Sequence, residues 1–457
     1  MNRRWLFVLA LLPMATVARA QPVEVPETWG GDWESRQRLT GDWGGVRDEL
    51  GKKGIVFDLD LLLTPQAVLD GGRSSDADAW GNVDYTLNID TQKAGLWPGG
   101  FLRVEGDTGF GNNVISNSGA LVPINTAALY PGLNERTTAL TNLSVTQFLS
   151  EHLGVTLGKF NLIDSGETEF YGNYRTQFLN AGLIFPTVLE QVPLSAWGAG
   201  VIAIPTKDVT FSALALNPNG TPTNNPVFGD SVAVLGSGQL TIRPFGLVGH
   251  QSVSFSWNDK PRYSLEQDPS NIGRLLLTSQ FPRLADPGPE LSAILQRYFP
   301  GLLVPTVPPN RKSSSWAFSY GFDQYFWQPT TKENEGIGVF FAFGISDGNP
   351  NPVRYSFLVG AGGKGVIPGR PADTFGVGFA STQFSSAFVP FLRDRLSLGL
   401  EHENALEMYY NLALGGWLTL TADFQLVNPA LEKALEGTQL MTVSTAAIAG
   451  VRLRARF

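Results

Sequence analysis

Residues 450–457 alternate strictly between apolar and polar side chains. One face carries only arginine and the other only apolar residues, namely Arg452, Arg454 and Arg456 against Val451, Leu453, Ala455 and Phe457. A period of two is typical of a β-strand with one apolar and one polar face. Such a strand fits the edge of a soluble sheet, and it also fits the closing strand of an outer-membrane barrel, whose outward side chains face lipid. The rest of the chain decides between these two structures.

The same period of two recurs from residue 55 onward. In residues 416–427, apolar side chains alternate with threonine, aspartate and glutamine. The other segments with this pattern are 55–63, 84–90, 101–107, 143–149, 154–160, 198–205, 209–216, 237–244, 250–257, 314–327, 336–347, 354–362, 374–382, 394–403 and 406–414. Together they predict a transmembrane antiparallel β-barrel of about sixteen strands, wide enough for water and small solutes to enter its lumen.

Two segments have helical spacing instead. Residues 43–53 place Val46 and Leu50 on one face before Gly54, a plausible C-cap, and predict a short periplasmic helix packed near the first strand. The longest interruption, residues 259–312, has apolar side chains at helical spacing between residues 291 and 298. It fits a loop that folds inward to narrow the pore, and equally a loop that extends outward from the barrel.

The first twenty residues read as a secretory signal peptide. Arg3 and Arg4 precede an apolar centre too short to span a bilayer, and small residues up to Ala20 form a cleavage site. Cleavage after Ala20 removes these two arginines and Arg19 but no acidic residue, so the formal net charge falls from −8 to −11. We therefore expect a signal peptide (1–20), an N-terminal periplasmic segment (21–54) and a barrel domain (55–457).

Composition favours the membrane barrel over a soluble fold. The chain is exported yet has no cysteine, so disulfides cannot hold it together. Charged residues make up only 16 % of the chain, against about 25 % in typical soluble domains. Beyond the signal peptide, no run of about 18 apolar residues could span a membrane as a helix. Strands closed into a barrel satisfy every backbone group inside lipid without such helices.

An ordered set of stretches resembles the carbohydrate-selective porins of the OprB type. It covers nearly the whole chain after the signal peptide and comprises LTGDWGGVRDELGKKGI (39–55), WPGGF (97–101), LGKFNLIDSGETEFYGNYRTQF (157–178), residues 338–370 and residues 393–429. Residues 259–312 have no clear counterpart. The resemblance implies a sixteen-stranded barrel in the outer membrane of a Gram-negative bacterium that passes glucose or other small sugars by diffusion, as a monomer or a trimer.

Charged and amide side chains on the predicted lumen faces are the candidates for pore-lining sugar contacts. They are Asp84, Asn88, Arg103, Glu105, Lys159, Glu167, Glu169, Arg175, Glu401, Glu403, Asp423, Arg452 and Arg454. Such groups lower the cost of moving a hydroxylated solute, because they replace the hydrogen bonds that the solute loses with water.

Other functions find less support in the sequence. The chain has only His152, His250 and His402, none beside a Gly-flanked serine, so we expect neither an enzyme nor a metal site or cofactor. The expected partners are small sugars, outer-membrane lipid and the barrel-assembly machinery, which would recognise Phe457; no nucleic acid is expected. A general porin and a plugged structural or adhesive barrel remain the alternatives.

Overall fold

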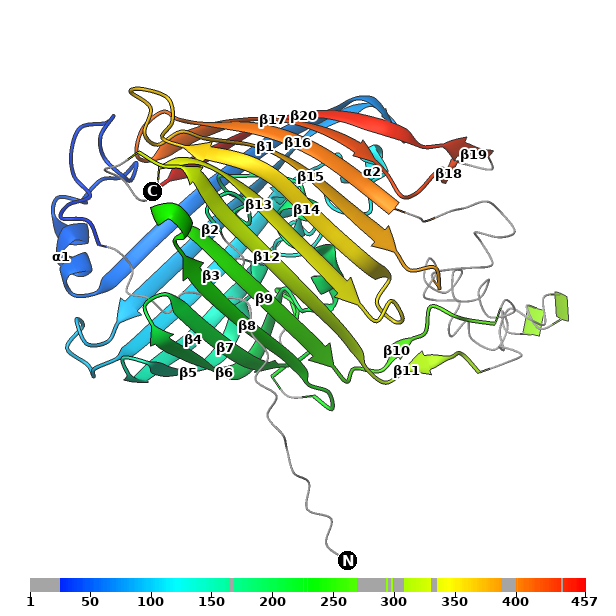
Figure 1. Cartoon of the computed structure of the whole chain (residues 1–457), viewed down its shortest axis with the longest axis horizontal. Helices are drawn as coiled ribbons and strands as arrows, with labels where there is room; N and C mark the ends of the chain where they lie inside the picture. The colour runs from blue at the N-terminus through cyan, green and yellow to red at the C-terminus, as the bar shows by residue number, and fades with distance from the viewer. Residues whose placement is uncertain are drawn as a thin grey trace, which may run out of the picture.

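A closed antiparallel barrel of sixteen strands dominates the part of the chain that the structure describes (Figure 1). The computed structural model describes residues 25–163, 168–224, 226–227, 229–268, 293–294, 297–298, 308–329, 335–387, 400, 402–436 and 439–457. Around the wall the strands are β1 (Ile55–Gly72), β2 (Asp76–Asp90), β3 (Gly100–Gly111), β4 (Thr138–Ser150), β5 (Leu153–Asn161), β6 (Ser195–Thr206), β7 (Val209–Leu216), β8 (Ala233–Ile242), β9 (Gly249–Asn258), β12 (Ser315–Trp327), β13 (Gly336–Ser346), β14 (Val353–Lys364), β15 (Thr374–Phe384), β16 (His402–Ala413), β17 (Leu418–Asn428) and β20 (Ser444–Arg456). Pairing of β1 with β20 closes the wall, and the predicted fold class is confirmed.

One predicted strand is not a separate member of this wall. Residues 394–403 were expected to form their own strand, but β15 pairs directly with β16. Only His402 and Glu403 of the segment belong to a wall strand, at the start of β16. Apart from Leu400, the rest of the segment lies outside the described residues. The segment therefore adds no separate strand between β15 and β16.

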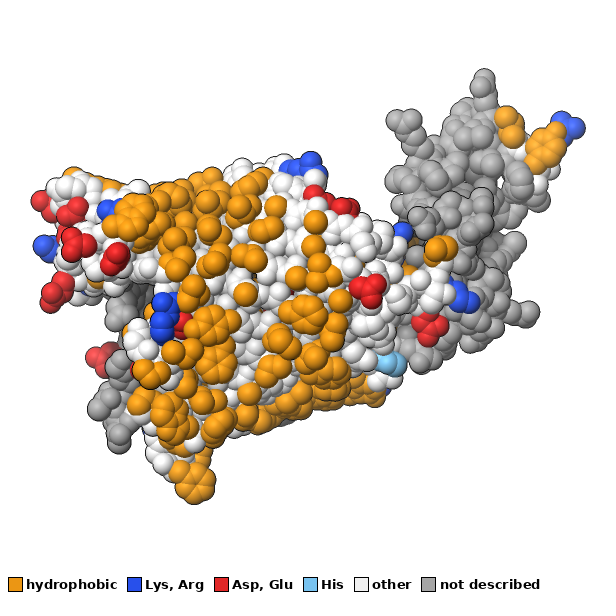
Figure 2. Space-filling view, turned by 90° about the horizontal axis from the view of Figure 1, so that it is seen from above, with side chains coloured by type: hydrophobic (Ala, Val, Ile, Leu, Met, Phe, Trp, Pro, Cys, Tyr) orange, Lys and Arg blue, Asp and Glu red, His pale blue; other side chains and the backbone are white. Residues whose placement is uncertain are grey.

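The outer face of the wall is a broad apolar band (Figure 2). In β20, Val451 is 41 % exposed whereas the neighbouring Arg452 is 1 % exposed, so the arginine face points inward. The same alternation along β17 leaves Leu426 exposed and buries Gln425. Among the described residues, no helix is both long and apolar enough to cross a bilayer. An apolar exterior around a polar interior is the arrangement of a membrane barrel.

The N-terminal segment packs against the end of the barrel where the chain also terminates (Figure 1). Its helix, α1 (Val46–Lys52), begins three residues later than predicted, because Trp43, Gly44 and Gly45 all have positive φ. The buried Arg47 donates from Nη2 to Asp58 Oδ1 (2.9 Å) in β1 and to the backbone oxygen of Phe457 (3.0 Å). This arginine therefore joins α1 to both strands of the closing seam.

The two ends of the barrel differ in the length of their connections. Short turns such as 151–152 and 207–208 lie at the end where the chain terminates, and the longest loops lie at the other end (Figure 1). The loop end carries the hairpins β10 (Arg262–Tyr263) with β11 (Arg311–Lys312) and β18 (Lys433–Glu436) with β19 (Gln439–Thr442) (Figure 1). The 3-10 turn η5 (Pro244–Gly246) lies between β8 and β9. Of the helix predicted near residues 291–298, residues 293–294 and 297–298 are helical, and the others lie outside the described residues.

Candidate functional site

Two loops fold into the lumen and pack against the wall. Loop L2 (residues 112–137) contains α2 (Ile115–Ser118) and η1 (Thr126–Leu129), and loop L3 (residues 162–194) contains η3 (Ala181–Leu183) and η4 (Thr187–Gln191). Ile124 of L2 and Phe178 of L3 belong to the same buried apolar cluster as Trp80 and Phe340 of the wall. The lumen is therefore narrowed by L2 and L3.

Glu403, on the inner face of β16, holds the backbone of L2. Its carboxyl oxygens accept hydrogen bonds from the N–H groups of Leu121 and Val122, both at 2.8 Å. One oxygen also accepts from the N–H of Ala430, at 3.2 Å. The side chain is buried, and these contacts fix L2 to the wall.

Glu407 lies four residues further along β16 on the same face and holds L3 in the same way. Its oxygens accept hydrogen bonds from the N–H groups of Leu179 (2.5 Å) and Asn180 (2.9 Å). Gln425 of β17 links the two loops, because it accepts from Asn180 Nδ2 (3.2 Å) and donates to the backbone oxygen of Ile124 (2.9 Å). The inner face of β16 and β17 is thus a docking surface for both loops. The alternation along the strand could have identified Glu407 as an inward-facing residue. Nothing in the sequence shows which wall residues contact a loop.

Arg452 of β20 extends this docking surface. Its guanidinium donates to the backbone oxygens of Tyr174 (2.6 Å) and Gln177 (2.8 Å), both in L3. Asp423 of β17 accepts a hydrogen bond from Gln425 Nε2 at 2.9 Å and is buried beside it. The structure therefore brings two of the predicted lining residues together under L3.

A charged cluster forms where L3 meets β2 and β3. Arg175 of L3 donates from Nε to Asp84 Oδ2 of β2 at 2.8 Å. Asp84 lies opposite Asp107 in the β2–β3 register, and Asn82 donates to Asp107 at 3.1 Å. Asp107 was not among the predicted site residues, although it shares the predicted polar face of its strand. The cluster joins L3 to the wall at β2 and β3. Around the wall, β17, β20 and β1 lie between this cluster and β16.

A second group of charges lies nearer the end of the barrel that carries the short turns. Arg103 and Glu105 form an ion pair of 2.8 Å on β3, with the Arg103 side chain 36 % exposed. Asn88 lies directly opposite Arg103 in the β2–β3 register. Arg454 of β20 pairs with Asp60 of β1, and both are partly exposed. The inner face from β20 to β3 is thus a continuous charged surface, which we call the charged wall (Asp60, Asp84, Arg103, Glu105, Asp107 and Arg454).

Lys159 has a different environment from the other predicted residues. In the β4–β5 register it lies opposite Leu143, which is exposed on the apolar exterior. Its Nζ donates to the backbone oxygens of Leu140 (2.6 Å) and Pro222 (2.9 Å), and the side chain is fully buried. Gly158, with a φ of 142°, precedes it. The ammonium group therefore lies away from the charged wall.

Three glutamates complete the predicted set. Glu169 of L3 accepts a hydrogen bond from the hydroxyl of Tyr325 on β12, at 3.0 Å. Glu167 and Glu401 lie outside the described residues. Within the described ranges, no group of three or more His, Asp or Glu side chains could hold a metal ion.

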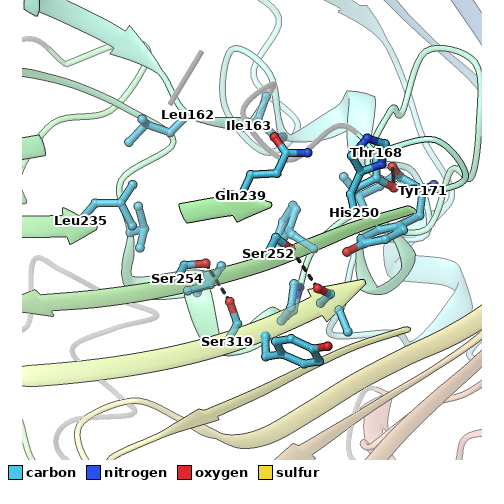
Figure 3. Close-up of a pocket in the computed structure, with 18 of the residues that line it drawn as sticks. Leu162, Ile163, Thr168, Tyr171, Leu235, Gln239, His250, Ser252, Ser254 and Ser319 are labelled. Carbon is cyan, nitrogen blue, oxygen red and sulfur yellow. Dashed lines mark hydrogen bonds between the residues drawn. The ribbon is translucent and has the colours of Figure 1, made fainter. Parts of the chain in front are cut away.

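A cavity lies on the opposite side of the lumen, between L3 and the inner faces of β8, β9 and β12 (Figure 3). It has a volume of about 140 Å³. His250 Nδ1 and Asp323 Oδ1 are 2.8 Å apart on its wall side, and Ser254 and Ser319 share a hydrogen bond of 2.8 Å. These residues were not predicted as site residues, although the alternation in residues 250–257 places His250 and the serines on one face.

Comparisons with known proteins agree with this geometry. The family model described as "Carbohydrate-selective porin, OprB family" matches residues 74–457. The high-pH structure of Pseudomonas putida OprB aligns with a TM-score of 0.73 and 19 % identity, covering 93 % of this chain and 100 % of that one. The low-pH structure of the same protein aligns with a TM-score of 0.55 and 15 % identity, covering 93 % and 99 %. A search of curated proteins found no match.

Proposed function

Because the chain belongs to the OprB family of carbohydrate-selective porins, we propose that sugars passing through it contact the charged wall. The protein is an outer-membrane channel that passes sugars. The single observation that supports the proposed contact is the Arg103–Glu105 pair, whose arginine is substantially exposed on an inward-facing strand position. Asp84, Asn88, Arg175 and Arg454 flank this pair, and we propose them as further contacts.

The charged wall suits a hydroxylated solute for physical reasons. Arginine presents several donors in a fixed plane and carboxylates accept hydrogen bonds, so together they can replace the water around a sugar. Short turns mark the periplasmic end in barrels of this kind. On that orientation, Arg103 and Arg454 lie on the periplasmic side of the narrowing made by L3.

Single-channel recording in planar bilayers tests this proposal. Glucose at millimolar concentration should reduce the ion current of the wild type, and Arg103→Ala or Glu105→Ala should weaken that block. Arg243→Ala is the matched control, because Arg243 pairs with Asp208 at the same 2.8 Å but on exposed turns outside the lumen. Unchanged block in both charged-wall variants would contradict the assignment.

Liposome swelling separates sugar selectivity from general permeability. Sugars should enter faster than neutral amino acids of matched size. Equal rates would leave the alternative of a general porin, and absence of any ion current would favour a plugged barrel.

The remaining features of the proposal concern processing and assembly. We propose cleavage after Ala20, a periplasmic segment at 21–54 ahead of the barrel domain at 55–457, and recognition of Phe457 by the barrel-assembly machinery. We also propose that the channel catalyses no reaction. Monomer and trimer both stay open as oligomeric states.

A further inference from the structure

The cavity beneath L3 has one polar and one apolar side. The loop contributes the apolar side chains of Leu162, Phe185 and Leu189, whereas the strands contribute mainly hydroxyl, amide, imidazole and carboxyl groups (Figure 3). Sites for small ligands are typically concave and largely apolar, with a few converging polar groups. A sugar ring has the matching chemistry, because its hydroxyls lie at the edge and its C–H groups lie on the faces.

Asp323 provides the strongest argument that the cavity holds a ligand. The residue is 1 % exposed and borders the cavity. Its Oδ1 accepts from His250, but its Oδ2 has no hydrogen-bond partner among the described residues. A buried carboxyl oxygen without a donor is unfavourable. A ligand hydroxyl donating to Oδ2 would remove that penalty.

Gly321 brings an aromatic ring of L3 close to this part of the wall. A Cβ added at residue 321 would lie 2.7 Å from the hydroxyl oxygen of Tyr171 and 3.2 Å from Ser252 Oγ, so any larger residue would displace the tyrosine. Tyr171 also stacks on Phe340, with ring centroids 5.2 Å apart. The edge of the cavity is therefore held in place by packing on two sides.

We infer that this cavity binds a single pyranose-sized sugar, with hydroxyls directed at Asp323 and the serines and one ring face against the apolar side chains of L3. One water needs about 10–15 Å³ of such a cavity, so a volume of about 140 Å³ holds several waters and leaves room for one sugar ring. The inference rests on the proposed function and deepens it. It places a second sugar contact across the lumen from the charged wall.

Two variants test the site by different routes. Asp323→Asn keeps the shape of the side chain but changes the acceptor Oδ2 into a donor, and Ser254→Leu fills the cavity. Each should raise the glucose concentration that half-blocks the ion current at least tenfold, the loss expected for one buried hydrogen bond to a charged group. Thr156→Leu is the matched control, because Thr156 of β5 shares a wall hydrogen bond with Thr146 of β4 and does not line the cavity. Glucose should block this variant as it blocks the wild type.

The outcomes separate this inference from the proposed function. The site is overturned if glucose blocks Asp323→Asn and Ser254→Leu as strongly as it blocks the wild type. It is also overturned if glucose does not reduce the current of the wild type. If Asp323→Asn fails to assemble into a heat-modifiable barrel, Ser254→Leu alone decides. Block lost in Arg103→Ala but kept in both cavity variants removes the cavity and leaves the charged wall. Wild-type liposomes that swell no faster in glucose than in a matched amino acid instead remove sugar selectivity.

Discussion

Replacement of Glu407 by alanine should release L3 from the wall. The substitution leaves the N–H groups of Leu179 and Asn180 without their acceptor, in a part of the lumen where the glutamate is fully buried. A buried amide that loses its partner costs about 1–3 kcal/mol, so two of them weaken the docking of L3 by about 2–6 kcal/mol. Since 1.4 kcal/mol is a factor of ten in an equilibrium constant, even the lower value raises the undocked population roughly thirtyfold.

Single-channel conductance is the direct assay for this release. Glu407→Ala should give larger or fluctuating conductance steps, together with faster entry of neutral amino acids relative to sugars in swelling experiments. Glu407→Gln is the graded control, because its carbonyl oxygen still accepts one of the two hydrogen bonds. Glu403→Gln perturbs the other loop, L2, and separates the two effects. An alanine variant that folds and keeps both the wild-type conductance and the wild-type selectivity would refute the role of Glu407 in holding the narrowing loop.

Two further predictions concern the end of the barrel that carries the short turns. Arg47→Ala should lower stability by about 1–3 kcal/mol in urea unfolding, because it removes hydrogen bonds to Asp58, which keeps its ion pair with Arg38, and to the backbone oxygen of Phe457. An unchanged unfolding midpoint would contradict this prediction. Burial tends to raise the pKa of Asp373, but hydrogen bonds from Arg370 and other donors hold this pKa below its usual range. The contribution of Asp373 to stability is therefore present above pH about 4 and is lost as the pH falls through the folded pKa. Asp373→Asn should therefore flatten the acid side of the stability–pH curve, and an identical slope in the variant would argue against this pair.

The barrel itself could be predicted from alternation because the rule is local. A strand between lipid and lumen repeats every two residues, and each strand of this kind adds the same signal independently of its neighbours. The inward arginines and outward apolar residues of β20 followed from this rule. Alternation at residues 394–403 predicted a separate strand that the wall does not contain, because β15 pairs directly with β16.

The narrowing of the pore could not be predicted in this way. L2 and L3 have no repeating pattern, and their positions depend on contacts between residues far apart in the chain, such as Glu407 with Asn180 or Arg452 with Tyr174. The longest interruption, residues 259–312, fitted an inward loop and an outward loop equally well. Length indicates room for a loop, but the acceptors on the wall decide which loop folds inward.

The polar inner face of this barrel therefore has two physical roles that parity alone cannot separate. On β16 and β17, buried side chains such as Glu403, Glu407 and Gln425 are engaged by loop backbone, so a sugar could reach them only by displacing a loop. On the charged wall, Arg103 keeps an exposed guanidinium. Engagement of the side chain by backbone groups, rather than charge, is thus the property that distinguishes a residue that shapes the pore from one that can meet a sugar. By the same criterion we do not expect Lys159 to contact a sugar, because its ammonium group is buried and donates to the backbone oxygens of Leu140 in β4 and of Pro222.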